Sequence, residues 1–271
     1  MEFIVHRLAT CGSTNDAARE LAAAGAPEGT VVVANEQTAG RGTKGRSWHS
    51  APGLGLYASI LLRPASADIS LLPLAAGVAA RDAVESSHGL SARLRWPNDI
   101  LFDGRKLGGV LCESSIAGGR PEFAILGIGL NVNHGPGDFP SELRASAVSI
   151  GGALGRRADP GRLFAALLAA VDFRLGALAR GDAGGLIRAF NDQSVFLSGE
   201  PVLISSAGPA LVRGSDPGPS AAEDDPQAKL GAPAAARRYS YEGIGPGGAL
   251  LARDAAGALR RFVSAEVRKA L

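Results

Sequence analysis

Three cations alternate with three glycines in one short loop of this chain, 40-GRGTKGRS-47. The cations are Arg41, Lys44 and Arg46, and the glycines are Gly40, Gly42 and Gly45. Glycine lets backbone amides approach a ligand, and arginine offers a forked donor to carboxylate or phosphate oxygens. The loop therefore predicts an anion-binding site, with a solvated basic hairpin tip as the alternative.

Read from Gly40, the same loop lies one substitution away from the phosphate loop G-x-x-x-x-G-K-[ST], with Arg46 in the lysine position. A phosphate loop follows directly on a buried strand and opens a helix. Here five residues separate Gly40 from the apolar run that ends at Ala34, and residues 48–57 are too rich in Gly and Pro to begin a helix. This context argues against a nucleoside-triphosphatase loop.

Three further stretches carry polar groups between glycines or in turns. They are 95-RWPND-99, 106-KLGGVLCE-113 and 127-GIGLNVN-133. Each alone is a weak signal, because Asn and Asp often bond their own backbone in turns and glycines often mark only close strand packing. The specific feature is the order and spacing of all these stretches in one chain.

In this order the motifs resemble those of the biotin–protein ligase family. They comprise 13-STN-15, Gln37, 40-GRGTKGR-46 with Trp48, 95-RWPND-99, 106-KLGGVLCE-113 and 127-GIGLNV-132, and the C-terminal SAEVRK resembles the family's closing strand. The resemblance covers about residues 8–205 and 241–269. It implies that the carboxylate of biotin attacks the α-phosphorus of ATP, bound with Mg²⁺, to give biotinyl-5′-AMP and pyrophosphate. A lysine of the biotin carboxyl carrier domain of a carboxylase then takes the biotinyl group and releases AMP.

The resemblance also implies which residues act. Arg41, Lys106 and Asp99 are the expected catalytic residues, because cations offset the repulsion between two anions and Asp99 can orient or deprotonate the acceptor lysine. The expected biotin-binding residues are Ser13, Thr14, Asn15, Gln37, Gly40, Arg41, Gly42, Thr43, Lys106, Gly109 and Gly129. The expected ATP- and adenylate-binding residues are Arg41, Arg46, Trp48, Asn98, Lys106 and Asn131. No protein-bound metal and no tightly held prosthetic group are expected.

Several of these residues also have a structural explanation. Residues 13–15 can cap a helix, Trp48 can pack in a core, and Asp99 can cap backbone amides in its turn. Thr43 departs from the family pattern, since many members carry arginine there, and this puts tight retention of the adenylate in doubt. Two other functions stay open: a lipoate–protein ligase of the same broad fold, and a binding module without catalysis, against which Arg41 and Lys106 argue.

The elements that must position these residues alternate between helix and strand patterns. Helices are predicted at 14–25, 70–89, 159–179 and 182–192, and strands at 30–37, 55–64, 92–96, 107–114 and 122–133, with a polar turn at 97–106. This order predicts an α+β fold, a mixed β-sheet with helices packed on it. The resemblance implies the class II aminoacyl-tRNA synthetase-like form of that fold, as a biotin- and ATP-binding catalytic domain over residues 1–194.

From residue 195 to 271 the pattern changes to a small β-domain, for which the resemblance implies an SH3-like β-barrel. Strand patterns cover 200–205, 248–254 and 258–269. Residues 208–238 between them are rich in Pro, Gly, Ala, Ser and charge, which predicts a disordered insertion over most of this range.

Composition narrows the class of protein. The 271 residues include 28 Lys and Arg against 26 Asp and Glu, and a formal net charge of +2 does not indicate a nucleic-acid-coating surface. Only about a dozen residues precede Ser13, so no DNA-binding domain and no DNA partner are expected. Two separated cysteines, with no signal-like N-terminus and no membrane-length apolar run, predict a cytoplasmic protein without a membrane partner. The oligomeric state stays open between monomer and homodimer.

Overall fold

The computed structural model describes the chain except for residues 65–68, 119, 206–209, 212–235 and 271. The chain forms two compact units, Met1–Ser194 and Val195–Leu271. Most of the predicted insertion at 208–238 therefore lies outside the described residues.

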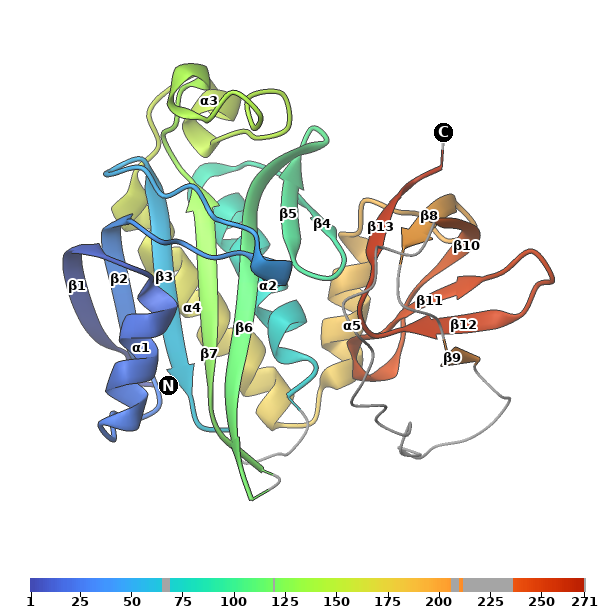
Figure 1. Cartoon of the computed structure of the whole chain (residues 1–271), viewed down its shortest axis with the longest axis horizontal. Coiled ribbons are helices and arrows are strands. Elements are labelled where there is room, and N and C mark those ends of the chain that lie inside the picture. Colours follow the sequence, from blue (N-terminus) through green and yellow to red (C-terminus); the bar gives the residue numbers. More distant parts are fainter. Residues whose placement is uncertain (65–68, 119, 206–209, 212–235, 271) are drawn as a thin grey trace. The chain divides into compact units, whose positions relative to one another are not determined.

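The first unit is built on a seven-stranded mixed sheet with the order β1-β2-β3-β7-β6-β5-β4 (Figure 1). Its strands are β1 (Ile4–Cys11), β2 (Thr30–Gln37), β3 (Gly55–Leu62), β4 (Arg93–Arg95), β5 (Asp99–Phe102), β6 (Arg105–Ala117) and β7 (Arg120–Asn131). β1 and β2 are parallel, and every other neighbouring pair is antiparallel. The predicted mixed sheet is confirmed.

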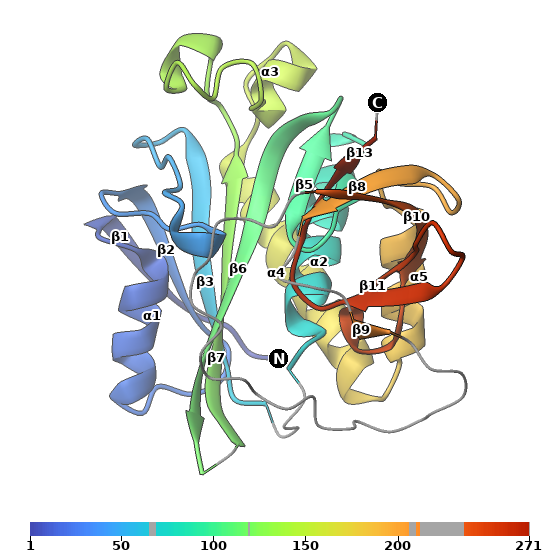
Figure 2. The same cartoon turned by 45° about the vertical axis from the view of Figure 1, so that its right-hand side comes forward.

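Helices cover both faces of this sheet. The helices of the first unit are α1 (Thr14–Ala23), α2 (Leu72–His88), α3 (Ile150–Leu154), α4 (Pro160–Ala179) and α5 (Ala183–Asp192), of which α1, α2 and α4 pack on the sheet. α1 packs on β2, β3 and β7, whereas α2 and α4 pack on each other and on the opposite face (Figures 1 and 2). Because both faces are covered, β2 and β3 read as nearly continuous apolar runs in the sequence.

Two helix starts that bear on the site follow from capping residues. The side chain of Ser13 accepts a hydrogen bond from the amide of Asn15 and caps α1, and Asp159 caps α4. The helix α2 ends at Gly89, which adopts φ of +69°, a left-handed conformation that glycine tolerates and that stops the helix. The predicted helix at 70–89 is therefore confirmed with slightly narrower bounds.

The prediction of a polar turn at 97–106 was wrong, because this stretch contains β5. Ile100 and Leu101 are buried, and residues 99–101 pair with β4 on one side while β6 lies on the other. The edge strand β1 and the short helix α3 were not predicted. β1 is largely exposed, so its sequence mixes apolar and polar residues and lacks a strong strand period.

The second unit is a six-stranded antiparallel sheet with the order β13-β8-β10-β11-β12-β9, as expected for an SH3-like β-barrel. Its strands are β8 (Pro201–Ser205), β9 (Ala210–Leu211), β10 (Arg237–Ile244), β11 (Leu250–Arg253), β12 (Leu259–Phe262) and β13 (Glu266–Lys269). β10 was not predicted, and its first two residues were assigned wrongly to the insertion. Tyr239 and Tyr241 are buried on β10, which explains why this polar-looking segment forms a strand.

Candidate active site

The loop that follows β2 folds back on itself as a short hairpin. The amide of Gly42 donates to the carbonyl of Arg46 at 2.7 Å, and the amide of Trp48 donates to the carbonyl of Gly40 at 2.8 Å. A single turn of 3₁₀-helix, η1 (Thr43–Gly45), forms the tip, and strand β3 rather than a helix comes next. The loop is therefore not a phosphate loop, and the Gly42 amide is already used inside the hairpin.

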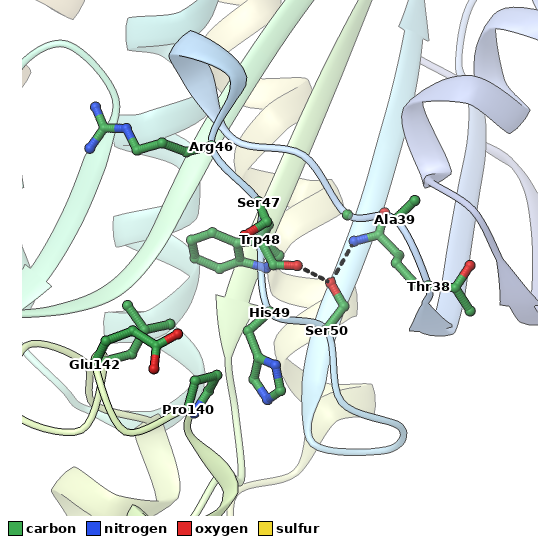
Figure 3. Close-up of a pocket in the computed structure, with 12 residues that line it drawn as sticks. Thr38, Ala39, Arg46, Ser47, Trp48, His49, Ser50, Pro140 and Glu142 are labelled. Atoms are coloured by element: carbon green, nitrogen blue, oxygen red, sulfur yellow. Dashed lines mark hydrogen bonds between the residues drawn. The ribbon is translucent and has the colours of Figure 1, made fainter.

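The base of this hairpin is bonded to the end of β2. Ser50 Oγ accepts from Gln37 Nε2 at 2.8 Å and donates to the carbonyl of Trp48 at 3.2 Å (Figure 3). A Cβ atom on Gly40 would lie 2.6 Å from the Trp48 carbonyl oxygen and 2.8 Å from Ser50 Oγ, so only glycine fits there without a shift. The hairpin thus starts from a fixed point beside Gln37.

A line of neutral hydrogen-bonding groups runs from Gln37 to the start of α1. Gln37 Oε1 accepts from the Thr14 amide at 2.8 Å and lies 3.0 Å from Thr14 Oγ1. The hydroxyls of Thr14 and Ser59 are 2.7 Å apart, and Ser59 Oγ lies 2.6 Å from Asn15 Oδ1. Ser13, Thr14, Asn15 and Ser59 are all buried. The structure therefore brings the four predicted polar residues together and adds Ser59.

Gly127→Ala is expected to destabilise the first unit by about 1–3 kcal/mol, as overpacking does elsewhere. A Cβ atom on Gly127 would lie 2.2 Å from Asn15 Oδ1, and Asn15 cannot move without losing its hydrogen bonds to Ser59 and Glu113. Denaturant unfolding of both proteins measures the difference. Gly12→Ala is the matched control, because nothing lies within 4 Å of a Cβ atom there. Equal stability of the two variants would show that the Asn15 position is not constrained.

Arg41 lies in a cluster of four charges. Its two terminal nitrogens form a bidentate pair with Asp16, with Nη2 to Oδ1 at 2.8 Å, and Nη2 also lies 3.2 Å from Glu113 Oε2. Arg19 reaches the same two carboxylates, with Nη1 at 2.8 Å from Asp16 Oδ1 and Nη2 at 3.2 Å from Glu113 Oε2. Asn15 Nδ2 donates to Glu113 at 2.6 Å, which joins this cluster to the neutral line.

Both carboxylates of the cluster keep their charge at neutral pH. The hydrogen bond from Arg41 holds the pKa of Asp16 below its usual value, in spite of partial burial. Burial raises the pKa of Glu113, but the hydrogen bond from Asn15 and the charges of Arg41 and Arg19 outweigh it, so the net pKa is lowered. The same bonds raise the pKa of Arg41 further above neutrality. The cluster therefore holds two cations and two anions.

Lys106 lies in a second ionic group, beside the ring of Trp48. Its Nζ is 2.6 Å from Asp99 Oδ1 and 5.4 Å from the centre of the Trp48 ring. Arg95 Nε donates to the other oxygen of Asp99 at 3.1 Å. The Asp99 side chain is only 15% exposed. Burial raises the pKa of Asp99, but the charges and hydrogen bonds of Lys106 and Arg95 bring it below the usual value.

Two predicted asparagines, Asn131 and Asn98, hold the backbone around Lys106. Asn131 Nδ2 donates to the carbonyls of Lys106, at 3.3 Å, and Val148, at 3.1 Å, and so ties β7 to these two segments. Asn98 Nδ2 donates to the Val110 carbonyl at 2.7 Å.

Two glycines leave room beside these groups. A Cβ atom on Gly129 would come within 2.7 Å of the Trp48 indole, so the bare backbone of β7 is what lets the ring lie there. A Cβ atom on Gly109 would lie 3.4 Å from Cε and 3.5 Å from Nζ of Lys106, in ordinary contact with the end of that side chain.

A cavity of about 550 Å³ opens beside the hairpin (Figure 3). It is lined by Gln37, Thr38, Ala39, Gly40, Arg46, Ser47, Trp48, His49, Ser50, Pro140, Glu142 and Leu143. Within the described residues, the buried Nε1 atom of Trp48 has no hydrogen-bond partner. Arg41, Lys106 and Asp99 do not line this cavity, whereas the predicted residues Gln37, Gly40, Arg46 and Trp48 do.

Sequence reasoning missed four residues of this arrangement. Asp16 directly follows the STN motif and Glu113 ends the KLGGVLCE motif, but neither was assigned a part. Arg19 stands one helical turn after Asp16, the spacing at which side chains meet. Ser59 is a polar residue inside the apolar strand GLYASILL, a pattern that signals a buried polar contact.

Two negative observations apply to the part of the chain that the structure describes. No three His, Cys, Asp or Glu side chains gather there as a metal site. No helix there is both long enough and apolar enough to cross a membrane.

Several known proteins are similar in sequence to part of this chain. Residues 9–131 match the Biotin/lipoate A/B protein ligase family. The chain is 46% identical over 152 residues to the bifunctional ligase/repressor BirA of Bacillus subtilis, covering 54% of this chain and 46% of that protein. It is 37% identical over 158 residues to the biotin–[acetyl-CoA-carboxylase] ligase of Paracoccus denitrificans, covering 56% of this chain and 65% of that protein. The matched part thus spans about half to two thirds of these relatives.

A solved structure extends the similarity to nearly the whole chain. The biotin protein ligase from Aquifex aeolicus, in complex with biotin and ATP, superimposes with a TM-score of 0.78 at 25% identity. The superposition covers 98% of this chain and 99% of that one. In its motifs and its fold the chain is similar to these biotin–protein ligases, and residues 9–131 carry the match to the biotin/lipoate A/B protein ligase family.

Proposed function

We propose that this chain is an ATP-dependent biotin–protein ligase that works through biotinyl-5′-AMP and modifies one lysine of a biotin carboxyl carrier domain. The observation that carries the proposal is the placement of two cationic groups around one hairpin. Arg41 stands on the hairpin itself, and the Lys106 ammonium lies over the ring of Trp48 at its base. A reaction that joins a carboxylate to a triphosphate needs such groups, because they offset the repulsion between two anions.

The neutral line is suited to the head group of biotin, a urea that is polar and uncharged. Thr14, Asn15 and Gln37 present amide and hydroxyl groups, with Ser13 capping the helix that carries two of them. Gly40 and Gly129 make room for the hairpin and the Trp48 ring, while Gly42 and Gly109 add no side chain that would keep a ligand away. Thr43 opens the turn at the hairpin tip, where it would face the adenylate without adding a charge.

ATP would enter with Mg²⁺ on its phosphates, and the cations of the site would meet the α-phosphate. The carboxylate oxygen of biotin then bonds to the α-phosphorus as the bond to pyrophosphate breaks. Arg46 and Trp48 line the cavity and are suited to the nucleotide, with Asn98 and Asn131 fixing the strands beside Lys106. The biotin protein ligase from Aquifex aeolicus, whose structure is a complex with biotin and ATP, supports the same pair of substrates here.

In the second step an ε-amine attacks the acyl carbon, AMP departs with the bonding electrons, and the amine loses its proton. Asp99 is proposed to hold Lys106 in place rather than to take that proton, because a carboxylate paired with two cations and lowered in pKa is a weak base.

Asp99→Asn is accordingly expected to slow adenylate formation and transfer to the carrier by a similar factor, about tenfold each, since both steps use Lys106. Single-turnover rates of the two half-reactions measure this. Asp103→Asn, which replaces an aspartate of the β5–β6 turn, is the matched control. Transfer slowed alone, with normal adenylate formation, would instead identify Asp99 as the base.

ATP–pyrophosphate exchange tests the proposed function as a whole. Exchange is expected with biotin and not with lipoate, because the GRGTKGR and WPND motifs together favour biotin. Exchange with lipoate alone would make the chain a lipoate–protein ligase. Biotin binding without any exchange would make it a binding module.

A further inference from the structure

The guanidinium of Arg41 is heavily engaged without any substrate. An arginine side chain has five N–H donors, and a carboxylate or phosphate is held most firmly by two of them on one edge. Asp16 takes both terminal nitrogens of Arg41, and Glu113 takes Nη2 as well. A substrate anion can therefore make a bidentate contact with Arg41 only by displacing at least one of these carboxylates.

Arg19 binds the same two carboxylates from the next turn of α1. Its contacts of 2.8 Å to Asp16 and 3.2 Å to Glu113 use its own terminal nitrogens, independently of Arg41. Glu113 also keeps the hydrogen bond from Asn15 at 2.6 Å. If Arg41 turned away, both carboxylates would thus still have partners, and neither would be left as an uncompensated charge.

We propose that Asp16 and Glu113 are internal competitors for Arg41 and that Arg19 is the positioning residue that compensates both when Arg41 turns to a substrate anion. This inference rests on the proposed anion-binding part of Arg41. In the ligand-free protein the four charges balance, and the hairpin is held by Asp16 and Glu113. When the carboxylate of biotin or the phosphate of the adenylate arrives, it replaces these carboxylates on Arg41, and Arg19 stays with them.

This replacement of carboxylates on Arg41 predicts specific changes in the affinity for biotin. Arg19→Gln leaves two carboxylates competing for Arg41 alone, so biotin is expected to bind about threefold to tenfold more weakly. Glu113→Gln removes one competitor, so biotin is expected to bind about threefold more tightly. The double variant Arg19→Gln/Glu113→Gln is expected to return to within about twofold of the parent chain, because the two changes offset each other.

Calorimetric titration of the full chain with biotin, without ATP, measures these affinities. Biotin methyl ester, which lacks the negative charge, is expected to bind all four proteins equally, whereas a merely structural defect would weaken both ligands. Glu122→Gln is the matched control, because it removes an exposed carboxylate from β7, which pairs with the β6 strand that carries Glu113. The proposal is overturned if Arg19→Gln weakens the binding of biotin and of its methyl ester alike. It is also overturned if adding Glu113→Gln to Arg19→Gln does not restore the affinity for biotin.

A ligand-free measurement separates this inference from the proposed function. Trypsin cleavage within residues 41–46, followed by mass spectrometry, reports how firmly the hairpin is held. Cleavage is expected to become several-fold faster in Glu113→Gln and Asp16→Asn and slower in Arg19→Gln, with Glu122→Gln unchanged. Cleavage rates equal to the parent in all variants overturn the inference, whereas a parent chain that binds no biotin overturns the proposed function alone.

Discussion

Replacing Lys106 by alanine is expected to lower the rate of biotin-dependent ATP–pyrophosphate exchange by about 10²–10³, the usual loss when one preorganised electrostatic group is removed. Asp99 and Trp48 fix the ammonium of Lys106, so it needs little rearrangement as negative charge builds up on the reacting oxygens. Its removal is expected to lower kcat more than it raises the KM for biotin, because the charge develops in the transition state.

Initial rates of ATP–pyrophosphate exchange, measured over a range of biotin and ATP concentrations, separate the change in kcat from the change in KM. Lys269→Ala, in the second unit, is the matched control, since it removes the same charge from an ion pair with Glu200. Asp99 keeps Arg95 in the Lys106→Ala variant, so the fold is expected to survive, and thermal unfolding checks this. An unfolding temperature near that of the parent with undiminished exchange would remove Lys106 from the mechanism.

Arg41→Ala is expected to lower the rate of biotin-dependent ATP–pyrophosphate exchange by a factor of about 10². The planar fork of arginine matches a carboxylate or a phosphate with two parallel bonds, and lysine cannot reproduce it. Arg41→Lys is therefore expected to recover less than a tenth of the loss, although it keeps the charge. Stability should change little in either variant, because the pairs are partly exposed and Arg19 stays on both carboxylates.

Exchange rates of Arg41→Ala and Arg41→Lys, measured beside Arg253→Lys, give the comparison. Arg253 forms an ion pair with Glu242 in the second unit, so it controls for the general loss of a guanidinium. If Arg41→Lys behaved like the parent chain, a point charge would suffice and the forked contact would not be needed.

The parts of the fold that could be predicted from the sequence are the buried strands that consist of long apolar runs. β2 carries four apolar residues in a row, and β3 is apolar along most of its length, so both were located closely. β5 was missed because only Ile100 and Leu101 are fully buried in it, between turn-forming residues. β10 was missed because Arg237 and Arg238 precede its buried tyrosines and resemble the polar segment before them.

The site was predicted as a set of motifs and not as a set of contacts. Order and spacing pointed to residues 13–15 and to Lys106, because each of them lies in a short contiguous motif. The partners of Arg41 could not be found in this way, since Asp16 and Glu113 are 97 positions apart and meet only through the packing of α1 on the sheet. Ser59 on β3 pairs with Gly127 on β7, and this pairing places Ser59 beside Asn15 of α1.

The most direct test of ligase activity is the intact mass of a biotin carboxyl carrier domain incubated with this chain, biotin and ATP. The proposed function predicts a mass increase of one biotinyl group on one lysine, absent when ATP or biotin is omitted and absent with Lys106→Ala. An unchanged mass with the parent chain, or an increase with lipoate in place of biotin, would contradict it.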